Sequence, residues 1–271
     1  MRMILKIIGC MALILIFSAG LLSFWWIGQK QKMYEDSYQS SYSYSISILT
    51  NQTLSNVIFY LPIPVLNNTS AVGKNIVENQ FNEINSSWEY ALVETEHGLM
   101  LSMKKDMLKP VFYSEATERI IPDTDPQEVE IIRITSDQYS EETPYPDTLD
   151  FSTLVVCNRS ISTKNPLGHE MVLMPKYNLI QNFTANESHL WMAEQPEVYT
   201  YQSKVYAQYE TSPDAQVIID IRMDAFNEWW VGGWQSNSFT DFINIRLSGP
   251  QHSWVSAHGE IITGIGVYMD A

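Results

Sequence analysis

Residues 42–48 read YSYSISI, and the fold class follows from this alternation. Four large side chains, those of Tyr42, Tyr44, Ile46 and Ile48, are separated by single serines. Successive side chains of a β-strand point to opposite faces, so this spacing buries one face and leaves the other in water. The stretch therefore predicts a half-buried strand at the start of a β domain.

The same pattern recurs downstream, with turn-forming residues between the copies. Asn56–Leu61 is a second predicted strand, and the apolar runs around Glu96-His97-Gly98 predict a hairpin with Gly98 at the position of positive φ. Roughly ten strands that end in Pro, Gly and Asp turns are typical of an all-β fold. We therefore expect an all-β, β-sandwich-like domain with a single helix over Val72–Glu83.

An apolar run precedes this domain at residues 7–28 and reads IIGCMALILIFSAGLLSFWWIG. As a helix it would span about 33 Å, enough for a bilayer core of about 30 Å. The stretch Trp25–Lys32 supplies the aromatic and basic residues of a membrane interface. We interpret the run as an uncleaved transmembrane signal anchor. The alternative is a signal peptide cleaved near Ser18–Gly20.

The anchor sets the expected order along the chain. Residues 1–6 form a cytoplasmic N-terminus, 7–28 the anchor, 29–41 a polar stalk and 42–271 an extracytoplasmic β domain. A subdivision of that domain near 139–150, an acidic and proline-containing stretch, is left open. The expected location is the cell membrane, as a single-pass protein with the bulk of the chain outside the cytoplasm.

Charge is distributed unevenly along the chain. Residues 33–271 carry 12 Lys or Arg and 31 Asp or Glu side chains, a net charge of −19 (12 − 31). Such a surface repels nucleic acid, which is therefore excluded as a partner. The two cysteines, Cys10 and Cys157, lie in the anchor and in the β domain, so neither an internal disulfide nor a cysteine zinc site is expected.

Sequons for N-glycosylation are more numerous than the composition would produce by chance, which favours a location outside the cytoplasm. The seven candidates are Asn51, Asn67, Asn68, Asn85, Asn158, Asn182 and Asn186. None lies in the 85 residues after Asn186. That part of the chain is therefore expected to present a glycan-free face on which a partner could dock.

The densest cluster of binding-type residues lies in this sequon-free part of the chain and begins with NEWWVGGW at Asn227–Trp234. Tryptophans stack on the apolar faces of sugar rings, while Asn, Asp and His side chains bond the hydroxyls. The alternative is that the tryptophans fill the core of the domain. The ligand-binding candidates are Trp229, Trp230, Trp234, Asn237, Asp241, His252 and Trp254.

Several stretches carry a resemblance: NVIFYLPIPV at 56–65, LVETEHG at 92–98, YETSPDA at 209–215, and the segment from WWVGGW at 229–234 to GPQHSW at 249–254. In these the chain resembles a group of uncharacterised membrane-anchored surface proteins from archaea, methanogens and halophiles among them. Ser253 stands where that group has Gly. The group has no assigned activity, so the resemblance implies location and architecture and no mechanism.

Catalytic motifs are not found: the sequence has no Gly-X-Ser-X-Gly elbow, phosphate loop, dinucleotide fingerprint or His-Glu-X-X-His. No catalytic residue, metal site or cofactor is predicted. We expect an envelope or surface protein that acts as a binding or structural module for a protein, glycan or wall component. The alternative is a membrane-tethered hydrolase of surface polysaccharide or peptide, which would require Glu228 or Asp241 beside His252 in a cleft.

Overall fold

The computed structural model describes most of the chain. The described residues are 2–79, 81, 88–114, 132–135, 145–182 and 196–268. The helices are α1 (Arg2–Ser37) and α2 (Ala71–Asn79). The strands are β1 (Gln39–Thr50), β2 (Leu54–Leu61), β3 (Ile63–Val65), β4 (Glu89–Thr95), β5 (Gly98–Leu108), β6 (Val111–Ser114), β7 (Ile132–Thr135), β8 (Tyr145–Asp147), β9 (Leu149–Cys157), β10 (Val172–Met174), β11 (Tyr177–Asn182), β12 (Glu197–Glu210), β13 (Gln216–Trp230), β14 (Trp234–Ser248) and β15 (Gln251–Gly266).

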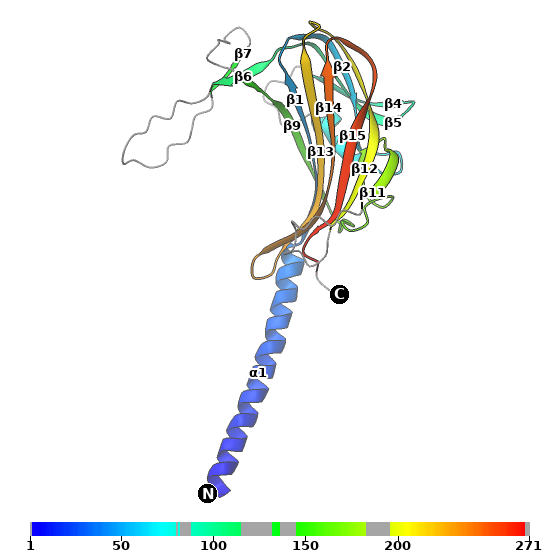
Figure 1. The fold of residues 1–271 in the computed structure, drawn as a ribbon. Helices are drawn as coiled ribbons and strands as arrows, with labels where there is room; N and C mark the ends of the chain where they lie inside the picture. The colour runs from blue at the N-terminus through cyan, green and yellow to red at the C-terminus, as the bar shows by residue number, and fades with distance from the viewer. Residues whose placement is uncertain are drawn as a thin grey trace, which may run out of the picture.

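One large antiparallel sheet dominates the molecule and curls around an interior (Figure 1). Its strand order is β4-β5-β2-β12-β15-β14-β13-β1-β9, and β11 pairs with the free half of β12 beside β2. Two smaller sheets, β10-β3 and β7-β6-β8, accompany it. The predicted all-β class is thus confirmed in its coarse form, as a mostly β chain with a curled sheet. A β-sandwich is not confirmed.

The predicted alternation is observed in β1. Tyr42, Tyr44, Ile46 and Ile48 are at most 1% exposed and face the interior of the curl. Full burial of such a side chain contributes about 1.5–3 kcal/mol. The predicted hairpin is also present, with β4 and β5 joined at Gly98, whose φ is 100°. Hydrophobic periodicity was therefore sufficient to locate these strands.

The interior of the curl is filled by α2, by the pair β3 and β10, and by the chain from 158 to 176, which we call the inner segment. Val72 and Ile76 of α2 are fully buried in the same core as the strands. Polar contacts join these elements to the sheet: the Tyr44 hydroxyl donates to the Pro62 carbonyl at 2.8 Å, and Ser203 Oγ donates to the Pro175 carbonyl at 2.7 Å. The predicted helix in this region is α2.

Helix α1 projects from one end of the curled sheet, at the end where the C-terminal strand also finishes (Figure 1). It continues through most of the expected stalk at 29–41, and β1 begins two residues after it. Within the residues that the structure describes, no helix has both the length and the apolar composition required to cross a membrane.

The sequons and the expected subdivision are described only in part. Asn51, Asn67, Asn68 and Asn158 are exposed. Asn182 is half-buried and donates from Nδ2 to Thr200 Oγ1 at 3.2 Å. Asn85, Asn186 and residues 139–144 of the expected boundary lie outside the described residues.

Gly259 of β15 is required by close packing. Its strand partner Tyr201 lays its ring across the glycine, so an added Cβ would meet Tyr201 Cζ at 2.3 Å. We predict that Gly259→Ala lowers the free energy of unfolding by about 1–3 kcal/mol, the usual cost of overpacking. Gly233→Ala is the control, because its Cβ would enter open space. Chemical denaturation of both variants measures the difference, and equal midpoints would contradict this packing argument.

Candidate ligand-binding site at the base of the sheet

Three buried polar groups or pairs help to hold the inner segment against the sheet, and the first is Asp241 of β14. This carboxylate is fully buried and accepts hydrogen bonds from the Leu173 amide at 2.9 Å, Tyr201 Oη at 2.5 Å and Lys176 Nζ at 2.7 Å. Burial lowers the pKa of Lys176 to about 8, although the charge of Asp241 opposes that shift. Burial has the opposite effect on Tyr201 and raises the pKa of its hydroxyl. Asp241 thus joins two strands to the inner segment.

Glu170 is the second contact. It is 3% exposed and accepts from Arg159 Nη1 at 2.8 Å, the Ser162 amide at 2.7 Å and Tyr42 Oη at 2.6 Å. Burial by itself raises the pKa of the carboxyl, but hydrogen bonds from Arg159, Ser162 and Tyr42 outweigh burial and leave it lowered. The inner segment is therefore also closed on itself, because Arg159 and Glu170 both belong to it.

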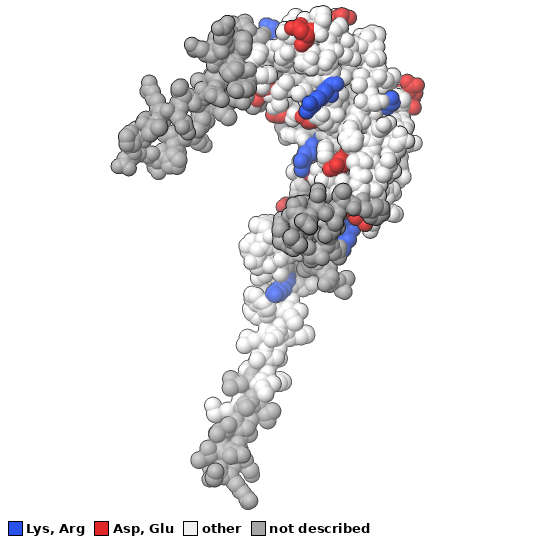
Figure 2. Space-filling model, in the orientation of Figure 1, with Lys and Arg blue, Asp and Glu red and all other residues white. Residues whose placement is uncertain are grey.

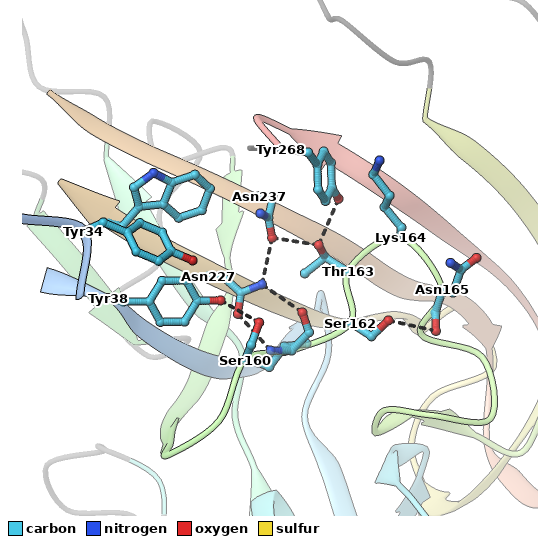
Figure 3. Close-up of a pocket in the computed structure, with 12 residues that line it drawn as sticks. Tyr34, Tyr38, Ser160, Ser162, Thr163, Lys164, Asn165, Asn227, Asn237 and Tyr268 are labelled. Carbon is cyan, nitrogen blue, oxygen red and sulfur yellow. Dashed lines mark hydrogen bonds between the residues drawn. The ribbon is translucent and has the colours of Figure 1, made fainter. Parts of the chain in front are cut away.

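The third contact is a pair of buried amides, Asn227 of β13 and Asn237 of β14, which face each other across the two strands. Asn227 accepts from the Ile161 amide and donates to the Ile161 carbonyl, both at 2.9 Å. Asn227 Nδ2 also donates to Asn237 Oδ1 at 2.7 Å, and the Thr163 hydroxyl donates to the same oxygen at 2.7 Å. This network sets the course of residues 160–165 (Figure 3).

A pocket of about 370 Å³ lies beside these residues, where the end of α1 meets the sheet (Figure 3). Its walls come from α1, the inner segment, β13, β14 and the chain after β15. Its lining residues are Tyr34, Tyr38, Ser160, Ile161, Ser162, Thr163, Lys164, Asn165, Asn227, Trp229, Asn237 and Tyr268. The volume falls within the range of small-molecule sites.

Aromatic rings form much of the pocket wall. Trp229 packs against Tyr34, with ring centroids 5.8 Å apart, and stacks on Tyr38 at 6.1 Å. Tyr38 Oη shares a hydrogen bond of 2.6 Å with Ser160 Oγ. Lys164 Nζ lies 4.3 Å from the centre of the Tyr268 ring. Helix α1 is therefore part of the pocket and is not merely attached to the domain.

The lining combines neutral polar groups with aromatic rings. Hydroxyls, amides and aromatic faces line the pocket, together with one lysine, and no Asp, Glu, His or Cys is among the lining residues. Such groups bind polyhydroxylated neutral molecules, whereas general acid–base catalysis requires a titratable group near neutral pH. On the face drawn in Figure 2, charged side chains are scattered singly over a mostly uncharged surface.

The seven residues predicted as one site lie in different places. Trp229 and Asn237 line the pocket, and Asp241 is in the interior with its oxygens occupied by protein donors. Trp230 and Trp234 are 40% and 65% exposed at the tip of the β13–β14 hairpin.

His252 and Trp254 lie on the outer face of β15. The Trp254 ring contacts His97 of the β4–β5 turn at 4.6 Å and Tyr206 of β12 at 5.4 Å. Tyr206 is also 6.5 Å from His252. The arrangement predicted for a hydrolase, with Glu228 or Asp241 beside His252, is not formed. Asp241 is inside the curl and His252 outside it, and Glu228 accepts from Gln39 near the end of α1, whereas His252 lies at the start of β15.

Sequence reasoning missed the contributions of α1, the inner segment and Tyr268. Tyr34 lies in the last turn of α1, and Tyr38 follows the helix with its amide still bonded to the Tyr34 carbonyl. Their spacing of four residues could have marked them as a pair. Thr163 and Lys164 lie in a segment without periodicity, and no local signal distinguishes them. Among the described residues, no three His, Cys, Asp or Glu side chains gather as they would around a metal ion.

The fold and the site define a mostly β protein with a curled antiparallel sheet and a neutral, aromatic pocket at the base of that sheet. No protein-family model, curated protein or solved structure matches the chain.

Removal of the cation beside Asp241 should be costly. Lys176→Met leaves a buried carboxylate without its charge partner, so we expect a loss of about 3–5 kcal/mol in the free energy of unfolding. Lys204→Met is the matched control, because Lys204 Nζ donates to Ser256 Oγ on an exposed surface, and its loss should stay below about 1 kcal/mol. Equal losses in the two variants would show that Asp241 does not depend on Lys176.

Glu170 should make the free energy of unfolding depend on pH in the acidic range. Its pKa is lower in the folded chain than the ordinary 4.5, so its contribution is complete above that value and is lost as the pH falls through the folded pKa. Glu170→Gln should therefore be less stable than the native chain at neutral pH, and the difference should shrink in acid. Unfolding midpoints from neutral pH to about pH 3 test this. The exposed Glu210→Gln is the control; a difference independent of pH would refute the assignment.

Proposed function

We propose that this chain is a membrane-anchored protein of the cell envelope whose β domain lies outside the cytoplasm and binds a sugar-bearing surface component. The anchor is supported by the uncharged apolar run at 7–28, and the location by the seven sequons. The resemblance to archaeal surface proteins agrees with both. The binding role is supported by the pocket between α1 and the sheet.

The observation that carries the proposal is the composition of that pocket. Four aromatic side chains, of Tyr34, Tyr38, Trp229 and Tyr268, stand around amides and hydroxyls in a space of about 370 Å³. Sugar rings present apolar faces to aromatic rings and hydroxyls to amides, so the lining complements a sugar of one or two rings. Its polar groups are already held by the inner segment, which reduces the ordering required on binding.

Binding is favoured over hydrolysis because the lining has no carboxylate or imidazole. Hydrolysis of a glycoside uses two carboxylates on opposite sides of the bond. The buried carboxylates Glu170 and Asp241 are committed to Arg159 and Lys176 respectively. A non-enzymatic module is therefore the function that the geometry supports best.

The finer fold assignment is also a proposal. The sheet β10-β3 lies within the curl, and β10 contacts both β14 and β5. These contacts support a second layer facing the large sheet, as in a β-sandwich.

The sugar proposal is tested with the full-length chain in lipid nanodiscs on an array of neutral hexose and N-acetylhexosamine oligosaccharides. We expect binding of a subset, and an approximately tenfold weaker Kd for Lys164→Ala/Asn165→Ala, which corresponds to about 1.4 kcal/mol. Both residues border the pocket without belonging to the buried amide network. Lys204→Ala is the matched control and should bind as the native chain does. No binding on the array, or equal loss in the control, would refute the proposal.

A further inference from the structure

The hairpin between β13 and β14 ends in two exposed tryptophans. Trp230 and Trp234 are partners in the strand register, with their rings edge to face and 5.8 Å apart. The turn between them is closed by a 3.0 Å hydrogen bond from the Val231 amide to the Gly233 carbonyl. Gly232 adopts the φ of 68° that this tight turn requires. The two indoles are thus presented on a short, ordered turn.

This hairpin is fastened to the end of α1. The Trp230 amide donates to Ser37 Oγ at 2.7 Å, and Gln39 Nε2 donates to Glu228 Oε1 at 2.7 Å. On the other face of the strand, Trp229 packs on the tyrosines of α1. In Figure 1 the hairpin lies beside the upper end of α1, on the side of the domain from which that helix leaves. Its position relative to the helix is therefore determined by the fold.

Exposure of these indoles requires an explanation. Trp88 and Trp229 are 5% and 2% exposed, and Trp254 is half-buried against its neighbours. Trp230 and Trp234, by contrast, leave 40% and 65% of their surface uncovered. Tryptophan has a large apolar body and a single polar N–H, and it is enriched where a bilayer meets water.

We propose that the Trp230–Trp234 hairpin inserts into the headgroup region of the bilayer that holds α1, and thereby sets the tilt of the β domain on the membrane. The inference rests on the membrane anchor of the proposed function. It assigns the two indoles to lipid, whereas Trp229 on the opposite face of the strand belongs to the sugar pocket.

The geometry predicts a lean of the domain. Ser37 lies nine residues beyond Gly28, which is about 14 Å of helix. The headgroup region occupies only about 5–8 Å of this height. The turn and the indole rings have to span the remaining distance between Ser37 and the headgroup region. A tilt of α1 of about 20°, the average for membrane helices, shortens this distance if it lowers the side of the domain that carries the hairpin.

The proposed attraction between the hairpin and the bilayer does not come from charge. Lys30 and Lys32 on α1 are matched by Glu35 and Asp36 on the same helix and by Glu228 on β13. Indole insertion is therefore expected in purely zwitterionic lipid, because it depends on the amphipathic ring and not on anionic headgroups.

The test uses the full-length chain with Cys10→Ser and Cys157→Ser, carrying an environment-sensitive dye on Gly233→Cys. This position is open, since nothing lies within 4 Å of an added Cβ. The chain is reconstituted in phosphatidylcholine vesicles brominated near the headgroup end of the acyl chains. We expect a blue-shifted, strongly quenched dye. The same dye on Ser253→Cys is the control and should remain unquenched, because this exposed position lies near the start of β15, at the end of the sheet away from the β13–β14 hairpin.

Adding Trp230→Ser/Trp234→Ser to the Gly233→Cys chain should remove most of the quenching without changing the unfolding midpoint, because both rings are exposed. Flotation of the vesicles separates the two proposals. If the chain does not float with the vesicles, the anchor fails and the hairpin proposal fails with it. If the chain floats but the dye on Gly233→Cys is unquenched, or the tryptophan substitutions leave the quenching intact, the hairpin proposal alone is overturned.

Discussion

The buried carboxylate of Asp241 is the interaction on which the arrangement of the interior depends. It accepts from three donors: Tyr201 of β12, and the Leu173 amide and the Lys176 ammonium of the inner segment. A buried charge is tolerated only when it is paired and hydrogen-bonded, so this site fixes where the inner segment lies. Tyr201 reaches Asp241 across the intervening strand because Gly259 has no side chain there.

The pocket is a consequence of this anchoring. The inner segment is held by Asp241 at its end, by Glu170 along its course and by the amides of Asn227 and Asn237 near its start. Between these points, residues 160–165 have little freedom, so they form a preorganised wall. The end of α1 completes the opposite wall with Tyr34 and Tyr38. The helix that we propose as an anchor and the surface that we propose as a sugar site therefore share side chains.

Alternation within strands explains why the predicted cluster did not form one site. Along β13, β14 and β15 the buried side chains of the well-packed stretches are those at odd-numbered positions. Trp229, Asn237 and Asp241 therefore face the interior of the curl, whereas Trp230, Trp234, His252 and Trp254 face outward. The alternation of inward and outward positions along each strand is enough to predict that these residues face opposite sides. The prediction of one site treated residues close in sequence as close in space, whereas a strand places neighbouring side chains on opposite faces.

The sequence by itself determined that the chain is mostly β, where strands such as β1 and the β4–β5 hairpin lie, and that a helix occupies the region of α2. These features follow from local period and turn chemistry, which a single stretch of chain contains. Only the tertiary structure decided that the sheet curls, that the inner segment crosses its interior, and that the end of α1 supplies one wall of the pocket. Those outcomes depend on partners far apart in the chain, such as Ser40 with Asn227 or Leu173 with Asp241, and no local pattern encodes such pairings.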